Sequence, residues 1–379
     1  MTCKVYGRGK NIGKIEVGAI ISTILLLARL VVSQNPAEIP ADKSRVNAWF
    51  NANVKPASAR VGTIDPALAQ AEAEPKVIKV VQGGGGDFDT ITKAIESVPT
   101  GNTKRVIISI GPGVYREKIK IERTKPFITL IGDPKSMANL TFDGTAKQYG
   151  TVASATLIVE SDFFVAANLF IVNTAPKPDG EMEGAQGVSL RVSGDKAAFY
   201  NCKIIGFQNT LCDDKGNHFF MNCYIRGTGI ELYVEEDKRQ TVITAQDREN
   251  NEQDQTGFSF VQCKITGTAQ GAYLGRAGKS SPRVVFAFTD MSNVVHPEGW
   301  SHNLTAERAQ TLFYGEYKCS GLGAASAARV PYSSQLTETV ALRFLTLGFI
   351  DGSRWLLPPP NLKLDKTIVL LGTHAQLYE

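Results

Sequence analysis

The sequence predicts an all-β fold, a right-handed parallel β-helix with a short N-terminal helix. The chain of 379 residues contains 35 glycines, and its strand-like runs are separated by Gly, Asn and Asp, which favours many turns and an all-β architecture. A second observation is a repeat in which an aromatic-rich run, an Asn or Gln and another β-type stretch follow each other in the same register. Stacked coils explain such a repeat, because each coil buries its inward side chains on its neighbour. The repeat occurs at residues 163–171, 197–204, 219–225 and 258–265.

Composition and charge narrow the class of protein. The chain is 43% hydrophobic and 21% charged, which is typical of a globular domain and excludes a disordered chain or a membrane bundle. A net charge of +4 is too small to indicate nucleic-acid binding, and it is compatible with an acidic polysaccharide.

The N-terminal segment, residues 1–33, has the layout of a secretory signal peptide. Basic residues precede the apolar stretch Val17–Val32, which ends at the small residue Ser33. The stretch includes Arg29 and is shorter than the roughly 20 apolar residues that a spanning helix needs. A cleaved signal is therefore the expectation, with an uncleaved anchor as the alternative. Two glycosylation sequons, at Asn139 and Asn303, fit an exported glycoprotein.

The lead-in, residues 34–75, is rich in Ala, Pro and charge and has room for one short helix. The main domain is expected to start near Lys76, where Val77–Val81 alternates as a strand. A run of glycines, Gly83–Gly86, follows, but it lacks the Gly-Lys-Ser/Thr ending of a phosphate loop. The apolar spacing of Asp89–Val98 then predicts a helix capped by Asp89 or Thr90.

The six cysteines are too few for a disulfide scaffold in a chain of this length. Cys202, Cys223 and Cys263 hold the same position of the repeat, directly after the Asn or Gln. A stack of free, inward thiols is the expectation, and a disulfide between Cys202 and Cys223 is the alternative. The chain has no Cys-x-x-Cys pair and only four histidines, so we expect no zinc site.

Eight ordered segments resemble the landmarks of plant pectinesterases. They are Gly113–Glu117, Asn173–Pro176, Gln186–Arg191, Gly206–Leu211, Thr241–Gln246, Leu274–Arg276, Phe313–Tyr317 and Trp355–Pro360. The resemblance implies a pectin-lyase-like β-helix domain at 76–360, with an atypical tail at 361–379. It also implies hydrolysis of the methyl esters of homogalacturonan (pectin) to pectate and methanol, without a cofactor or metal. A secreted, monomeric cell-wall protein is expected, with pectin and a proteinaceous pectinesterase inhibitor as partners and no nucleic acid.

The resemblance also assigns the site. Gln186 and Gln208 match the pair that stabilises the oxyanion, and Arg276 matches the arginine that orients the nucleophile. Without the family, these residues would be solvated amides and a surface charge. The acid/base aspartate of the Gln-Asp-Thr-Leu motif is Asn209 here, which has no proton to donate.

The nucleophile is predicted to be absent. The family's Asp-Phe-Ile-Phe-Gly segment is missing after Thr228, where the chain continues directly to Gly229 and Ile230. Glu231, Asp237 and Asp247 are candidate substitutes near the break, but we expect them to be solvated. Two further departures remove stacking surface for sugars: the family's Trp after Leu-Gly-Arg-Ala is Gly278, and the aromatic residue after Gln-Asp-Thr-Leu is Cys212. Trp300 remains, either in the groove or in the core.

Three hypotheses follow from this pattern. The first is an active pectinesterase whose recorded sequence lacks a coding segment. The second is a catalytically inactive pectin-binding or cell-wall structural protein, and the third is a chain that does not fold, because a shortened coil breaks the stacking between neighbours. A missing segment does not explain Asn209, so even a chain with that segment restored would be a weakened enzyme.

Overall fold

The computed structural model describes most of the chain outside its two ends. Residues Glu38–Glu379 form one compact unit and Met1–Ala37 another. The predicted signal segment lies outside the described residues, as does most of the tail. Within the described part, no helix is both long enough and apolar enough to cross a membrane. The described residues are 37–178, 183–227, 230–232, 240–249, 255–268, 271–303, 305–359 and 369–373.

The main sheet has 11 strands, and its spatial order follows the chain except at one position. Every described pairing in it is parallel except the two that involve β27. Parallel pairing of successive coils confirms the predicted β-helix. In spatial order the strands are β1 (Lys76–Val80), β2 (Val106–Ile110), β5 (Ile128–Gly132), β8 (Val165–Ala167), β11 (Ala197–Tyr200), β14 (Asn217–Met221), β27 (Val369–Thr373), β19 (Gly257–Val261), β22 (Arg283–Ala287), β25 (Phe313–Tyr317) and β26 (Ser333–Gln335).

The other faces of the solenoid are divided into two halves. In the first half, one sheet contains β3 (Val114–Arg116), β6 (Ala138–Phe142), β9 (Leu169–Asn173), β12 (Lys203–Ile205) and β15 (Tyr224–Arg226), and another contains β4 (Ile119–Ile121), β7 (Leu157–Val159), β10 (Leu190–Val192) and β13 (Leu211–Asp213). In the second half, the sheets contain β18 (Ala245–Gln246), β21 (Gly275–Ala277) and β24 (Trp300–Ser301), and β20 (Lys264–Ile265) and β23 (Asp290–Met291). We call residues 76–226 the first half-solenoid and residues 245–335 the second.

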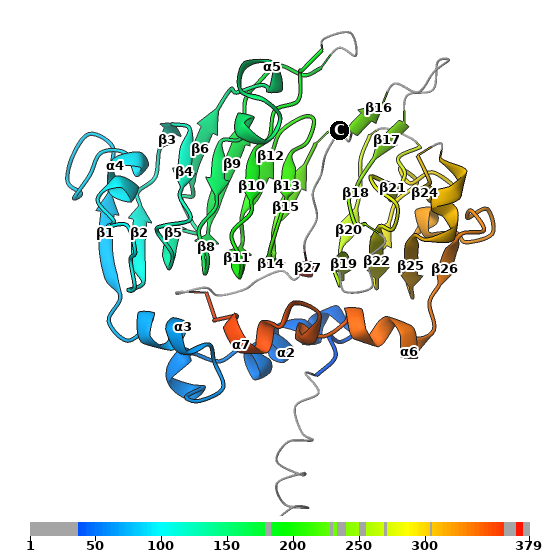
Figure 1. Cartoon of the computed structure of the whole chain (residues 1–379), viewed down its shortest axis with the longest axis horizontal. Helices are drawn as coiled ribbons and strands as arrows, with labels where there is room; N and C mark the ends of the chain where they lie inside the picture. Colours follow the sequence, from blue (N-terminus) through cyan, green and yellow to red (C-terminus); the bar gives the residue numbers. More distant parts are fainter. Residues whose placement is uncertain are drawn as a thin grey trace, which may run out of the picture. The chain divides into compact units, whose positions relative to one another are not determined.

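The break between the halves lies where the sequence predicted a missing segment. Described residues between the halves form a separate antiparallel hairpin of β16 (Ile230–Leu232) and β17 (Gln240–Val242). The main sheet nevertheless stays continuous, because β27 pairs antiparallel with β14 on one side and with β19 on the other. Figure 1 shows β27 between these two strands. A strand from the C-terminal tail thus lies between the two halves in the main sheet.

The Asn or Gln of the repeat has a specific backbone role. Asn168, Asn201, Asn222 and Gln262 have φ angles of 58°, 49°, 58° and 58°, in the left-handed region that asparagine tolerates better than most residues. Each lies directly after a strand of the main sheet. The repeat in the sequence therefore marks the corner at which each coil turns from one face to the next.

The interior is divided at the same place as the smaller sheets. One core cluster draws its fully buried members from the first half-solenoid, including Phe164, Phe199 and Phe220, and another draws its members from the second, including Phe286 and Trp300. Phe260 of β19 packs against both clusters. Among the described residues, Phe260 is therefore the aromatic side chain that connects the two core clusters inside the solenoid.

A layer of helices covers the outer face of the main sheet and contacts both halves (Figure 1). The lead-in forms two α-helices rather than the one expected, because apolar side chains of both helices pack on this sheet. Phe50 packs 5.8 Å from the ring of Phe219 in the first half, whereas Gln262 in the second half donates its amide to the carbonyls of Pro40 and Ala41. The helices of the layer are α2 (Val46–Asn53), α3 (Pro66–Ala71), α6 (Glu338–Ala341) and α7 (Gly352–Trp355).

Three further helical segments lie between strands of the first half-solenoid. Helix α4 (Ile91–Glu96) confirms the predicted helix, and the Thr90 side chain caps it by accepting a hydrogen bond from the Lys93 amide. Helix α5 (Ala146–Tyr149) and the short η3 (Val152–Ser154) lie between β6 and β7. The described cysteines are free thiols, as expected from the stack.

Candidate active site

The two glutamines lie on neighbouring coils, each in the loop that precedes a strand of the β4-β7-β10-β13 sheet. The amide of Gly187 donates to the carbonyl of Gln208 over 3.2 Å, and the amide of Ala146, at the start of α5, donates to the carbonyl of Gln186 over 2.7 Å. Both glutamine side chains are half-buried. The Oε1 atom of Gln186 is buried and has no hydrogen-bond partner among the described residues. The fold therefore brings the two predicted oxyanion residues side by side.

Asn209 follows Gln208 in a strained part of the same loop. Its φ is 58°, and an Asn side chain tolerates this left-handed conformation. The loop packs on the end of β15, because the amide of Gly206 and the hydroxyl of Thr210 both donate to the carbonyl of Arg226. The backbone at Asn209 is therefore held in place, and the departure from the family motif is confined to the chemistry of the side chain.

Arg276 lies in β21, between Ala245 of β18 and Ser301 of β24. Its side chain is only 2% exposed. Burial lowers the pKa of the Arg276 guanidinium, and the nearby Asp247 carboxylate opposes that shift. A buried cation needs an anionic partner, and among the described carboxylates Asp247 is the one that acts on Arg276 most strongly.

Asp247 owes its position to the departure at Gly278. A Cβ atom on residue 278 would overlap the Oδ1 atom of Asp247. The carboxylate therefore occupies the space into which any other residue at 278, including the family's tryptophan, would project its side chain. The expectation that Asp247 is merely solvated was wrong, since its side chain is half-buried and its Oδ1 atom is buried.

The break in the solenoid separates the candidate residues into two groups. Gln186, Gln208 and Asn209 adjoin β10 and β13, and β13 is the last strand of its sheet. Arg276 belongs to the sheet that begins with β18. In the described part of the chain, no strand joins these two sheets. Of the other carboxylates considered, Glu231 is described only as part of the backbone of β16, and Asp237 lies outside the described residues.

A row of four residues in register crosses the sheet beside the glutamines. Lys120, Ile158, Arg191 and Cys212 are paired from β4 to β13. Ile158 and Cys212 belong to a small buried cluster with Ala155 and Val188. At position 212, the aromatic residue of the family is therefore replaced by the small, buried side chain of a cysteine.

Arg191 is a site residue that the sequence reasoning did not single out. It donates to Asp214 over 2.6 Å and lies 3.6 Å from Glu160, which in turn lies 3.2 Å from Lys120. The signal in the sequence was a basic residue at one register position, Lys120 or Arg191, and an acidic residue two positions further along the neighbouring coil, Glu160 or Asp214. These ion pairs hold the charged side chains along the row in place before any ligand binds.

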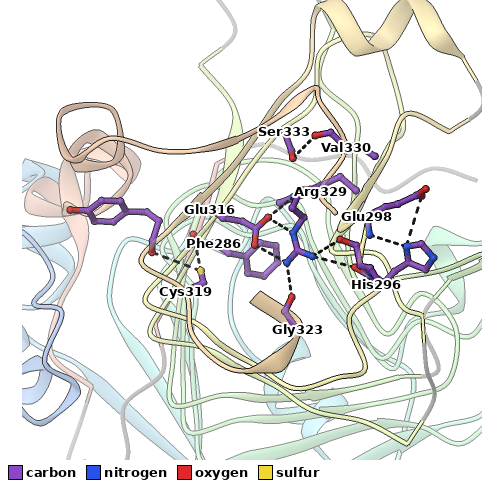
Figure 2. A network of polar contacts seen from close by, with 12 residues as sticks. Phe286, His296, Glu298, Glu316, Cys319, Gly323, Arg329, Val330 and Ser333 are labelled. Atoms are coloured by element: carbon purple, nitrogen blue, oxygen red, sulfur yellow. Dashed lines mark hydrogen bonds and ion pairs between the residues drawn. The ribbon is translucent and has the colours of Figure 1, made fainter. Parts of the chain in front are cut away.

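Trp300 belongs to the core and not to the groove. It is fully buried, stacks 4.4 Å from the ring of Tyr314, and its indole N–H donates to Glu316 over 3.1 Å. Figure 2 shows the other partner of Glu316, the guanidinium of Arg329, which forms two hydrogen bonds to this carboxylate at 2.8 and 3.0 Å. Trp300 therefore offers no surface for sugar stacking.

Comparison with known proteins places the chain in a family. The pectinesterase family profile matches residues 77–353. The chain is 48% identical over 360 residues to probable pectinesterase 49 of Arabidopsis thaliana, covering 92% of this chain and 99% of that protein. It is 47% identical over 359 residues to pectinesterase 2 of Olea europaea, covering 91% and 98%.

Solved structures agree with this placement. The pectin methylesterase from carrot matches with a TM-score of 0.68 and 29% identity, covering 77% of this chain and 99% of the carrot chain. The enzyme from Aspergillus niger matches with a TM-score of 0.60 and 25% identity, covering 73% and 96%. From the parallel β-helix, the ordered landmarks and these similarities, we conclude that the chain belongs to the pectinesterase family.

Proposed function

We propose that this chain is a secreted cell-wall protein whose groove recognises methyl-esterified homogalacturonan, and whose ester hydrolysis is impaired at two defined steps. The observation that carries the proposal is the contact between the loops of Gln186 and Gln208, joined by the hydrogen bond from Gly187 to Gln208. Amide donors on two neighbouring coils suit an ester carbonyl, whose oxygen becomes negative when it is attacked. The family to which the chain belongs supports the same substrate.

The first impaired step is proton transfer. In the reaction that we propose, a carboxylic acid at position 209 would protonate the departing methoxide and then activate water. Asn209 can hold the same geometry but carries no transferable proton. General acid–base catalysis typically contributes about 10²–10⁴-fold, and this is the loss that we assign to Asn209.

The second impaired step is the attack on the ester. A carboxylate is an effective nucleophile only when it is fixed at near-attack distance. The family segment that would carry it has no counterpart after Thr228, and Asp247 is the described carboxylate whose charge acts most strongly on Arg276. Since Asp247 lies at the end of β18, in the sheet separate from the glutamines, we assign it no nucleophilic role.

A second candidate function is a non-catalytic pectin-binding protein. Asn209 favours it, because the substitution lies outside the missing segment and removes the acid without disturbing the loop. The partner of either function is pectin, and a proteinaceous pectinesterase inhibitor would bind the same groove. We propose the extracellular cell wall as the location for both.

Two measurements on the purified chain test the proposal. Binding to highly methyl-esterified pectin is measured by co-sedimentation, with dextran as a neutral control, and methanol release is followed in the same samples. We expect pectin binding and no methanol above the blank. Turnover at the rate of an intact family member would refute the impairment, and equal affinity for dextran and pectin would refute the assigned substrate.

A further inference from the structure

We propose that Cys202 and Cys223 form a redox-modification site, at which a small-molecule disulfide converts the two thiols into a disulfide bond between neighbouring coils. The site lies at the broken end of the first half-solenoid, away from the candidate active site. It does not depend on the proposed function.

The backbone places the two cysteines opposite each other. Each follows an asparagine in the left-handed conformation, Asn201 or Asn222. The amide of Tyr224 donates to the carbonyl of Cys202 over 2.9 Å, and the next residue pair in register is Lys203 with Tyr224. Neighbouring strands lie about 4.8 Å apart, which is within the Cα separation of about 4.4–6.8 Å that a disulfide spans.

Both thiols also point to the same strand. Cys202 donates toward the carbonyl of Tyr200 over 3.4 Å and Cys223 toward that of Phe199 over 3.5 Å, and both carbonyls belong to β11. Cys202 is fully buried and Cys223 is half-buried. A reagent therefore reaches Cys223 first, and Cys202 is positioned to complete the bond.

The other described cysteines do not form such a pair. Cys263 and Cys319 belong to the same stack of the second half-solenoid, but the coil of Thr289 lies between them, since Asp290 donates to the Cys263 carbonyl and Ser320 to the Thr289 carbonyl. Two strand spacings, about 9.6 Å, exceed the reach of a disulfide. Cys212 lies on the sheet of the glutamines. Their position on neighbouring coils therefore makes Cys202 and Cys223 the pair that we expect to form the disulfide.

The reaction proceeds in two balanced exchanges. The Cys223 thiolate attacks the reagent disulfide, so that a mixed disulfide forms and one reagent thiolate leaves. The Cys202 thiolate then attacks the Cys223 sulfur and displaces the second reagent thiolate. The two protons lost by the cysteines pass to the two reagent thiolates, and the protein is oxidised by two electrons as the reagent is reduced. Burial raises the pKa of Cys202, which makes the second exchange the slow one.

The bond would matter because β15 is the last described strand of its sheet. Its three residues are all exposed, so little packing holds it. A disulfide from Cys223 to Cys202 would anchor β15 to the coil below, and closing a loop of this size is expected to raise the unfolding temperature by about 5 °C.

The test uses the full chain, purified reduced and then incubated with oxidised glutathione. After denaturation, free thiols are alkylated and the peptides are mapped without reductant. We expect the peptides that contain Cys202 and Cys223 to be joined and two hydrogen masses lighter, with a higher unfolding temperature than the reduced chain. Cys223→Ser should lose both effects, and the matched control Cys263→Ser should keep them.

Two results would overturn the proposal. One is full alkylation of both cysteines after oxidation of the wild-type chain. The other is a glutathione adduct that persists on Cys223, because it would show that Cys202 cannot reach the mixed disulfide. Both are read on the wild-type chain, so a variant that fails to fold leaves the test intact.

Discussion

Phe219 of β14 pairs with Leu371 of β27 in an antiparallel ladder, and Leu371 pairs in turn with Ser259 of β19. The strand from the tail thus joins two halves whose smaller sheets are separate. A shortened coil was expected to break the stacking between neighbouring coils. Among the described strands, the smaller sheets show this break, whereas β27 joins the two halves in the main sheet. Inside a sheet, a missing strand would leave two rows of unpaired N–H and C=O groups, and β27 satisfies both rows.

A proline in β27 should destabilise the protein. Leu370→Pro removes a backbone N–H from the ladder without touching either half-solenoid. We expect the free energy of unfolding in urea to fall by about 1–3 kcal/mol. Leu370→Val, which keeps the N–H and suits a strand, is the control and should change it little. Equal stability of the two variants would show that the antiparallel strand does not join the halves.

The lead-in helix α2 should be essential for stability through Phe50. This side chain is 1% exposed and packs against Tyr200 and Phe219. Phe50→Ala leaves a cavity under the helical layer and is expected to cost about 3–5 kcal/mol. Asn51→Ala, on the exposed side of the same helix, should cost less than about 0.5 kcal/mol. Thermal unfolding of both variants checks the difference, and similar melting temperatures would contradict the packing role of the lead-in.

Repairing one position should not restore activity. Asn209→Asp supplies the acid/base carboxylate, but no nucleophile has been added, so we expect methanol release to stay at the blank. In a chain that also carries the family's Asp-Phe-Ile-Phe-Gly segment after Thr228, Asn209→Asp should raise kcat by about 10²–10⁴-fold over the same chain with Asn209. If the single substitution alone produces turnover, a carboxylate already present acts as the nucleophile.

Gly278 and Asp247 should show coupled effects on stability. Gly278→Ala places a Cβ where the Asp247 carboxylate lies, and we expect a loss of about 1–3 kcal/mol from this overlap. In an Asp247→Ala background the overlap is gone, so the same substitution should cost much less. A double-mutant cycle in urea measures the coupling. Additive effects would show that the carboxylate does not occupy this space.

The buried pair of His218 and Asp213 should make stability depend on pH. The ring nitrogen Nδ1 of His218 meets the Asp213 carboxylate, and Nε2 meets the carbonyl of Gly194 at 2.8 Å. Both nitrogens face acceptors, and the protonated ring satisfies both by donating from each nitrogen. Burial alone would lower the pKa of His218, but the charge and hydrogen bond of Asp213 outweigh it and the pKa is raised.

The sign of the pH effect follows from this shift. A raised pKa in the folded state stabilises the protein fully below the unfolded pKa of about 6.5, and this contribution is lost as the pH rises through the folded pKa. We expect the advantage of the wild type over His218→Gln, measured by urea unfolding, to be largest at about pH 5–6 and to shrink above the folded pKa. An advantage that is constant with pH would contradict the imidazolium.

Much of the candidate site could be placed from the sequence, because local constraints repeat in every coil. The Asn and Gln positions of the repeat coincide with left-handed corners, and the order of the landmarks led to Gln186 and Gln208, which the fold brings onto neighbouring coils. Trp300 was left open between core and groove, because a large aromatic residue suits either environment until its neighbours are known. Asp247 was misjudged, because its burial depends on the space beside Gly278 that it occupies, and no local pattern reveals that space.

The sequence by itself determined the solenoid and the family resemblance, and it predicted a changed acid/base position at Asn209 and a missing segment after Thr228, since these depend on residue identity and short-range periodicity. Only the tertiary structure decided how the two half-solenoids are joined. The pairing of Val369–Thr373 with both β14 and β19 links segments far apart in the chain, and a strand takes whichever unpaired edges the rest of the fold leaves available.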